Sequence, residues 1–168
     1  CDRTLSLLKE SENKEKEITD KLYTDYKTLR AQMITSLAKD NPSIPLLEII
    51  QYTQTILDRI LFVAFAEDRG LLPTGTLKSC YEDRGKWNPQ PAWVNFKGLF
   101  RSIDKGNPPL RIPGYNGGLF VQNDKLNSLI VSDELCEGFK TIGEYDFESD
   151  VSVNILGHIF EQSITDLE

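Results

Sequence analysis

The fold is decided by the stretch Leu57-Asp58-Arg59-Ile60-Leu61-Phe62-Val63-Ala64-Phe65-Ala66-Glu67-Asp68-Arg69-Gly70. Seven consecutive apolar residues, 60–66, leave almost no polar side on a helix, and a helix that is apolar all round lies in the centre of a core. Ser43-Ile44-Pro45 predicts the start of this helix, because the N–H that proline lacks has no partner in the first turn. Gly70 predicts its end. We therefore expect a buried central helix over about residues 44–69.

A second long helical pattern precedes it over residues 14–40. Apolar residues recur there every three or four positions, which is the spacing of one helix face, while lysine, glutamate and aspartate fill the other face. Asn41-Pro42 predicts the end of this helix, because a residue before proline avoids the helical region. We expect residues 4–9 to form a separate short turn. The apolar face consists of Ile18, Leu22, Tyr26, Leu29, Met33 and Leu37.

The next segment, about residues 71–131, is expected to be rich in loops. Prolines and glycines interrupt residues 71–92 and again 105–118, and these residue types favour turns. Residues 119–131 are expected to contain a short strand or a turn. Between the interrupted parts, helical spacing returns at Trp93, Phe96, Leu99, Phe100 and Ile103.

Two more helices are expected toward the end of the chain. Ser132 can cap a helix that runs to about Ile142, and Asp150 can cap a last one with Leu156 and Phe160 on its apolar face. Together the patterns predict a mainly α fold, a multi-helix bundle with long loops and at most one short β-hairpin. A length of 168 residues suits a single domain.

The composition excludes several classes of protein. Apolar residues make up 39% and charged residues 27% of the chain, which is ordinary for a folded soluble domain. Seven apolar residues in a row cannot cross a bilayer, so no membrane partner is expected. The three cysteines lie far apart and indicate neither a disulfide framework nor a thiolate metal site, so a reducing cytoplasm is the simplest compartment. The chain starts without methionine and ends inside a helical pattern, so we expect a piece of a larger protein.

Charge is distributed unevenly along the chain, whose net charge is −7. Residues 133–168 contain ten acids and one lysine, whereas residues 76–132 contain eight basic and four acidic residues. The acidic total argues against binding nucleic acid over the whole surface, but a local phosphate contact is possible. Lys97, Arg101 and Lys105 are four residues apart, so they share one helix face that could contact phosphates. The alternative interpretation is that this face is only solvated. The candidate DNA-binding residues are Lys97, Arg101, Lys105 and Arg111.

Two short motifs invite a functional interpretation but favour a structural one. Asn107-Pro108-Pro109-Leu110 is similar to the Asn-Pro-Pro-aromatic motif of amino methyltransferases, but leucine replaces the ring that stacks on the target base, so we predict a plain turn. His158 and Glu161 share one helical face, but a metal site would need further ligands. We predict an ordinary histidine at a helix surface or an interface.

Charged residues lie in or beside the apolar helix, and an unpaired buried charge is costly. We therefore predict an interhelical ion-pair network. The alternative is a carboxylate site of an acidic, metal-dependent enzyme at Glu67 and Asp68. The charged residues in question are Asp58, Arg59, Glu67, Asp68 and Arg69.

Several segments occur in a fixed order over nearly the whole chain. They are Lys21-Leu22-Tyr23 with Leu29-Arg30, Leu57–Phe62 with Phe65-Ala66-Glu67-Asp68-Arg69-Gly70-Leu71-Leu72-Pro73, Tyr115-Asn116-Gly117-Gly118-Leu119-Phe120, Tyr145-Asp146-Phe147, and Leu156-Gly157-His158-Ile159-Phe160-Glu161-Gln162-Ser163. As an ordered set they resemble the helical spacer region of large single-chain Type IIG (MmeI-like) restriction–modification enzymes. Phage-defence methyltransferases of similar architecture look alike in this region.

The resemblance implies a non-catalytic helical connector between a nuclease domain before it and an adenine N6-methyltransferase domain after it, positioned on duplex DNA. S-adenosylmethionine and Mg²⁺ would serve those neighbouring domains, and no cofactor is expected in this segment. The catalytic motifs of neither domain are found in this sequence, so the resemblance assigns no catalytic residue. The alternatives are a DNA-backbone-binding module in its own right and an acidic metal-dependent enzyme that uses Glu67 and Asp68.

Overall fold

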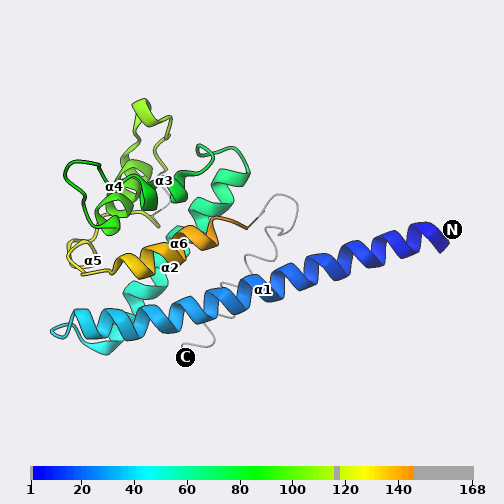
Figure 1. Cartoon of the computed structure of the whole chain (residues 1–168), viewed down its shortest axis with the longest axis horizontal. Coiled ribbons are helices and arrows are strands. Elements are labelled where there is room, and N and C mark those ends of the chain that lie inside the picture. The colour runs from blue at the N-terminus through cyan, green and yellow to red at the C-terminus, as the bar shows by residue number, and fades with distance from the viewer. Residues whose placement is uncertain (1, 116–117, 146–168) are drawn as a thin grey trace.

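The computed structural model describes residues 2–115 and 118–145, with side chains in the first helix from residue 20 onward. The fold is mainly helical, as predicted, and none of these residues forms a strand. In Figure 1 the long helix α1 runs along one side, and the other helices cluster against its second half. The helices are α1 Asp2–Asp40, α2 Leu46–Asp68, α3 Thr76–Glu82, α4 Ala92–Lys105, α5 Asp124–Asn127 and α6 Asp133–Ile142, with a 3-10 turn, η1, at Pro108–Leu110.

Helix α1 is longer than the pattern predicts, because it begins at Asp2. The separate turn that we expected at residues 4–9 is part of this helix, so that expectation is wrong. The chain has no glycine or proline between residues 2 and 41, and without such a breaker the helix continues. The apolar face between Leu22 and Leu37 is buried, as predicted.

Helix α2 lies within two residues of the predicted bounds. Its second half has the expected burial, but Leu46 and Leu47 in the first turn are largely exposed. Pro45 occupies the N-cap position, one residue before the first turn in which we expected it. Gly70 adopts a φ of 76°, a left-handed conformation that glycine tolerates and that ends a helix.

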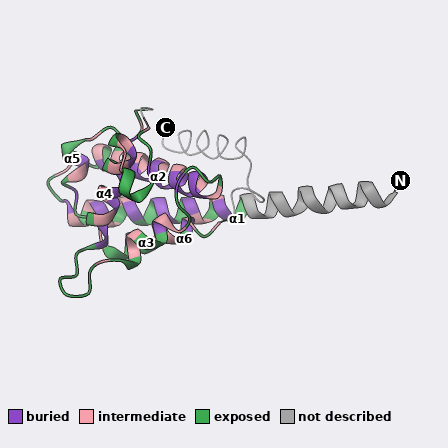
Figure 2. Ribbon diagram, turned by 90° about the horizontal axis from the view of Figure 1, so that it is seen from above, coloured by how far each residue is buried: buried purple, intermediate pink, exposed green. Residues whose placement is uncertain are grey.

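The core lies where α2 and α6 pack on the second half of α1, and α4 joins it through α3 and α6. Figure 2 shows the buried residues on the inner faces of these clustered helices. Aromatic rings join the elements edge to face: Phe96 of α4 packs on Phe139 of α6 with ring centroids 5.4 Å apart. Such pairs add to the hydrophobic effect of burying large side chains. The buried interior therefore links the long helix to the segment that carries the candidate cations.

Parts of the loop-rich segment differ from the prediction. Helix α3 forms inside residues 71–92, which we expected to be loop. Its first turn is stabilised from outside, because the carboxylate of Glu67 accepts a hydrogen bond from the Leu77 amide at 3.0 Å. The one-turn helix α5 occupies part of residues 119–131. In the described part of the chain, the expected hairpin is reduced to one antiparallel bridge between Asn107 and Ile112.

Helices α4 and α6 lie where the sequence predicts them. The Ser132 hydroxyl caps α6 by accepting a hydrogen bond from the Leu135 amide at 3.4 Å. The helix expected after Asp150 lies outside the described residues. Among the helices that are described, none has the length and apolar character to cross a membrane.

Candidate nucleic-acid interface

Three of the four predicted DNA-binding cations are exposed, and the fourth takes part in the fold. Lys97 is half-buried on α4, and its ammonium donates a hydrogen bond to the Asn127 carbonyl at 3.2 Å, which ties α5 to α4. Arg101 and Lys105 follow on the same helix with exposed side chains. Arg111 is exposed in the turn after η1. The surface available to a phosphate backbone therefore contains Arg101, Arg111 and the exposed Lys105, whose ammonium lies 3.8 Å from the Asp104 carboxylate, but the ammonium of Lys97 is already engaged.

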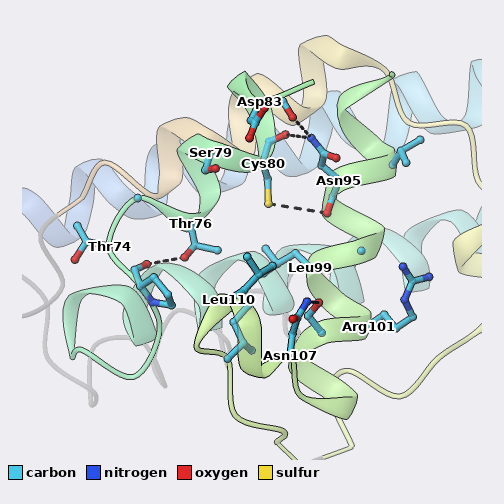
Figure 3. A pocket seen from close by; sticks show the side chains of 16 residues that line it. Thr74, Thr76, Ser79, Cys80, Asp83, Asn95, Leu99, Arg101, Asn107 and Leu110 are labelled. Carbon is cyan, nitrogen blue, oxygen red and sulfur yellow. Dashed lines mark hydrogen bonds between the residues drawn. The ribbon is translucent and has the colours of Figure 1, made fainter. Parts of the chain in front are cut away.

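A groove of about 600 Å³ lies beside Arg101, between α3, α4 and the turn at residues 107–112 (Figure 3). Gly98 leaves space for it, because a Cβ at that position would meet nothing closer than the Arg101 guanidinium at 3.9 Å. Hydroxyl and amide groups lie next to apolar side chains in this groove, so it offers both hydrogen bonds and contact area. Its lining includes Thr76, Ser79, Cys80, Asn95, Asn107 and Leu110.

The polar groups of this groove favour binding over catalysis. Burial raises the pKa of the Cys80 thiol to about 12, so the thiol stays protonated at neutral pH and is a poor nucleophile. The Asn95 amide donates hydrogen bonds to the carbonyls of Cys80 and Asp83 at 3.0 and 2.7 Å, and these bonds hold the end of α3 against α4. The groove walls are therefore fixed by contacts that the fold itself requires.

The Asn-Pro-Pro-Leu segment forms a turn, as predicted. Asn107 exchanges two backbone hydrogen bonds with Ile112, at 2.8 and 3.1 Å, and η1 lies between them. The side-chain amide of Asn107 donates to the Ser102 hydroxyl at 3.1 Å, so its nitrogen is bound to α4. Leu110 stands exposed at the groove edge, where a methyltransferase motif would have an aromatic ring.

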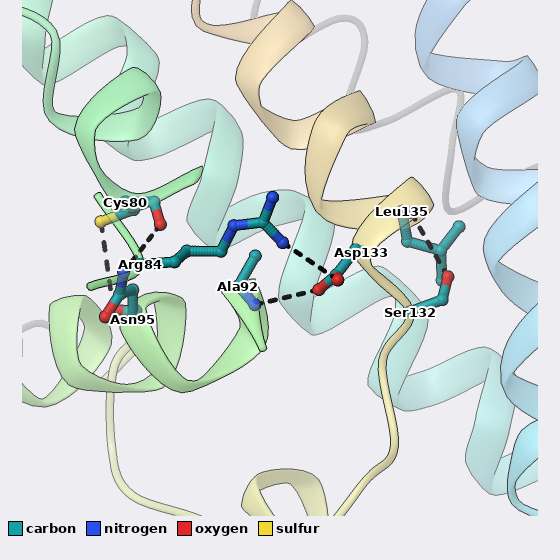
Figure 4. A network of polar contacts seen from close by, with 7 residues as sticks. All are labelled: Cys80, Arg84, Ala92, Asn95, Ser132, Asp133 and Leu135. Atoms are coloured by element: carbon teal, nitrogen blue, oxygen red, sulfur yellow. Dashed lines mark hydrogen bonds and ion pairs between the residues drawn. The ribbon is translucent and has the colours of Figure 1, made fainter. Parts of the chain in front are cut away.

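A second exposed feature is the loop of residues 84–91 between α3 and α4, which the sequence reasoning did not single out. Figure 4 shows that one carboxylate holds both ends of this loop. Asp133 of α6 binds the Arg84 guanidinium at 3.0 Å and accepts a hydrogen bond from the Ala92 amide at 3.0 Å. Trp87, in the middle of the loop, is 89% exposed. Glycine and proline on both sides of Trp87 were the available signal, because they keep the residue out of any helix.

The two buried charges of α2, Arg59 and Glu67, bind backbone groups of other segments rather than the interhelical ion-pair partners that we predicted. Arg59 is 2% exposed, and its guanidinium donates hydrogen bonds to the carbonyls of Leu119 and Val121 at 2.8 and 2.9 Å. Glu67 is 7% exposed and caps α3. Burial raises the pKa of Glu67 to about 7, although the hydrogen bonds from α3 amides oppose this rise.

The candidate metal site at Glu67 and Asp68 has no support among the described residues. Within residues 20–115 and 118–145, no three potential metal ligands gather into a cluster. Glu67, the carboxylate of the acidic alternative, is occupied by the α3 backbone instead. His158 and Glu161 lie outside the described residues.

Comparisons with known proteins point toward restriction–modification systems. No protein-family model matches the chain, and no solved structure matches it. The chain is similar to a predicted type II restriction enzyme and methyltransferase of Methanocaldococcus jannaschii, with 28% identity over an alignment that covers 68% of this chain. The aligned part spans only 12% of that relative's length. The similarity supports a relationship between this chain and restriction–modification enzymes.

Proposed function

We propose that the chain is a non-catalytic helical connector in a restriction–modification protein of Type IIG organisation. A nuclease domain would precede it and an adenine N6-methyltransferase domain would follow it, both acting on duplex DNA in the cytoplasm. S-adenosylmethionine and Mg²⁺ would serve those two domains. The similarity to a much longer restriction and methylation protein supports this proposal, because a connector is one part of such a chain.

The observation that carries the proposal is the shape of α1. This helix has 39 residues, which corresponds to about 58 Å at 1.5 Å per residue. Its second half is anchored through Leu22, Tyr26, Met33 and Leu37, all fully buried. Its first half extends beyond the cluster of helices (Figure 1). A helix held along half its length fixes the position of its other half, which is what a spacer between two active sites requires.

The turn after α1 is braced as a rigid joint. The Asn41 amide nitrogen donates to the carbonyls of Leu37 and Ile130, at 2.9 and 3.0 Å, and its oxygen accepts from the Ile130 amide at 2.8 Å. One buried side chain thereby joins the end of α1 to the segment before α6. Such bonds resist rotation of α1 relative to the helical cluster, in support of a rigid connector.

The test is an insertion in α1 of the full-length protein that contains this chain. Seven added helix-forming residues between residues 9 and 17 lengthen the helix by about 10 Å and nearly restore its rotation. That length corresponds to about three base-pair steps of 3.4 Å. We expect the DNA cut to move by about this offset while staying sharp, as measured by sequencing the cleaved ends.

A seven-residue glycine–serine insertion at the same position is the matched control. It adds a similar number of atoms without rigidity, so the cut positions should scatter rather than shift. Methylation of the recognition site, measured in the same preparations, reports whether each variant is folded. Sharp cutting at the original offset in both variants would contradict the connector proposal.

A second candidate function is direct contact with the DNA backbone through Arg101, Lys105 and Arg111. The observation in its favour is that residues 76–132, which include all three side chains, contain eight basic and four acidic residues in a chain of net charge −7. Such a local excess attracts a polyanion even when the whole molecule is acidic. Salt-dependent binding of the chain to duplex DNA tests this function.

A further inference from the structure

Trp87 is held in an unusual position for a tryptophan. It is 89% exposed, whereas Trp93, six residues later, is 3% exposed and packs in the core. The Lys86 ammonium lies 5.0 Å from the centre of the Trp87 ring. Large exposed aromatic surface costs hydrophobic free energy, so a fold that keeps it outside has a candidate binding residue there.

The loop that carries Trp87 is held in one conformation by several contacts. The Gln90 amide donates a hydrogen bond to the Arg84 carbonyl at 2.9 Å and closes the loop on itself. Gly85 adopts a φ of 85°, and a Cβ there would lie 3.1 Å from the Asn88 carbonyl oxygen, so the turn is tight and needs glycine. Asp133 binds both ends of the loop, at Arg84 and at the Ala92 amide (Figure 4). The indole is therefore presented by a preorganised loop, which lowers the entropy cost of binding.

The charge around the loop indicates the chemistry of its partner. Arg84 and Lys86 lie in the loop, which follows Glu82 and Asp83, and no acid occurs from Arg84 to Ile103. Asp133 already pairs with Arg84, which leaves Lys86 as the cation next to the indole. An aromatic face beside a cation fits a strand whose bases can stack and whose phosphates are negative. In an intact duplex the base faces are covered by their neighbours, so an unpaired strand fits the indole better.

We propose that this loop binds single-stranded DNA, with the Trp87 indole stacked on a base and Lys86 beside a phosphate of the same strand. The proposal rests on the proposed function for its DNA context, and it adds a binding site separate from Arg101, Lys105 and Arg111. Stacking needs no particular base, because every base has an aromatic face, so binding is independent of sequence.

Tryptophan fluorescence tests the stacking directly. The chain has two tryptophans, and Trp87→Phe leaves only the buried Trp93 as reporter. On titration with a single-stranded oligonucleotide of about 15 nucleotides, we expect quenching in the unmodified chain and little in Trp87→Phe. Binding measured by anisotropy of the labelled oligonucleotide should weaken about tenfold or more in Trp87→Ala, while Trp87→Phe keeps most of the affinity. Leu47→Ala, at another exposed apolar position, should bind normally.

A duplex of the same length is the second arm of the experiment. We expect the chain to bind the duplex more weakly than the single strand and without quenching of Trp87 fluorescence. The proposal is overturned by absent Trp87 quenching with the single strand, by equal affinity of Trp87→Ala, or by equal quenching with the duplex. These outcomes leave the connector proposal intact, because the cut offset after insertion in α1 does not depend on Trp87. An unmoved cut site with clear Trp87 quenching would remove the connector proposal alone.

Discussion

At the scale of single residues, the buried charges of α2 are compensated by backbone groups. Glu67 accepts hydrogen bonds from the first turn of α3, and Arg59 donates to two carbonyls of the segment that follows Gly118. The guanidinium of Arg59 also lies over the Phe100 ring, 5.2 Å from its centre. Burying a charge is costly unless polar partners surround it. Through these hydrogen bonds, both residues hold neighbouring segments against α2.

Glu67 makes stability depend on pH in a predictable direction. Burial raises its pKa from 4.5 to about 7, so the folded chain binds more protons than the unfolded chain between these values. Stability therefore falls as pH rises through this window, by about 1 kcal/mol between pH 6 and 7. Glu67→Gln stays neutral and keeps an oxygen for the Leu77 amide, so it should lack this decrease. Urea denaturation at several pH values measures the difference.

The window above pH 6 isolates Glu67 from Asp58. Burial raises the pKa of Asp58 to about 6, so most of its effect on stability occurs at lower pH. Glu137→Gln, at an exposed position of α6, is the matched control and should leave the pH dependence unchanged. If Glu67→Gln loses stability between pH 6 and 7 as steeply as the unmodified chain, the assignment to Glu67 is wrong.

At the scale of elements, helices with strong local sequence signals could be predicted from the sequence. Helices α1 and α2 follow long apolar periods, and Gly70 and Ser132 act through their own conformation or side chain. Helix α3 could not be predicted in this way, because its cap comes from Glu67, ten residues before Leu77. The partners of Arg59 lie about sixty residues away in sequence, and no local pattern specifies them. Glycine and proline around Trp87 indicate a loop, but only the structure shows that its ring is exposed while that of Trp93 is buried.

The loop of residues 84–91 depends on an acid of another element, and removing that acid tests it. Asp133→Ala deletes the acceptor of the Ala92 amide and the partner of Arg84. We expect the free energy of unfolding to fall by about 1 kcal/mol. Most of this loss comes from the Ala92 hydrogen bond, because the ion pair with Arg84 is partly exposed. Trypsin should then cut after Lys86 several times faster under native conditions. Asp133→Asn keeps an oxygen for the Ala92 amide, so its cutting rate should lie between those of the unmodified chain and Asp133→Ala. An unchanged cutting rate in Asp133→Ala would show that Asp133 does not hold the loop.

At the scale of the whole molecule, opposite charges are separated along the chain. Residues 133–168 contain ten acids and one lysine, whereas residues 84–103 contain cations only among their charged residues. The cation-bearing helix α4 packs on α3 and α6, and α6 packs on the anchored half of α1, so one hydrophobic core connects α4 to the long helix. In the proposed connector, this arrangement would hold the exposed cations at a fixed place relative to the long helix. The same helical scaffold would then both set the spacing between the neighbouring domains and contact DNA phosphates weakly.

The salt dependence of duplex DNA binding distinguishes the exposed cations from the engaged one. Each phosphate contact contributes about 0.9 to the slope of log affinity against log salt, so replacing Arg101, Lys105 and Arg111 together by alanine should lower the slope by about 2 to 3. Lys97→Ala should leave the slope unchanged and lower stability, because the Lys97 ammonium holds the Asn127 carbonyl. The sequence pattern alone treats all four cations alike. A slope reduced by Lys97→Ala as much as by Arg101→Ala would therefore favour the sequence pattern over the structure, and an unchanged slope in the triple variant would exclude this surface from DNA binding.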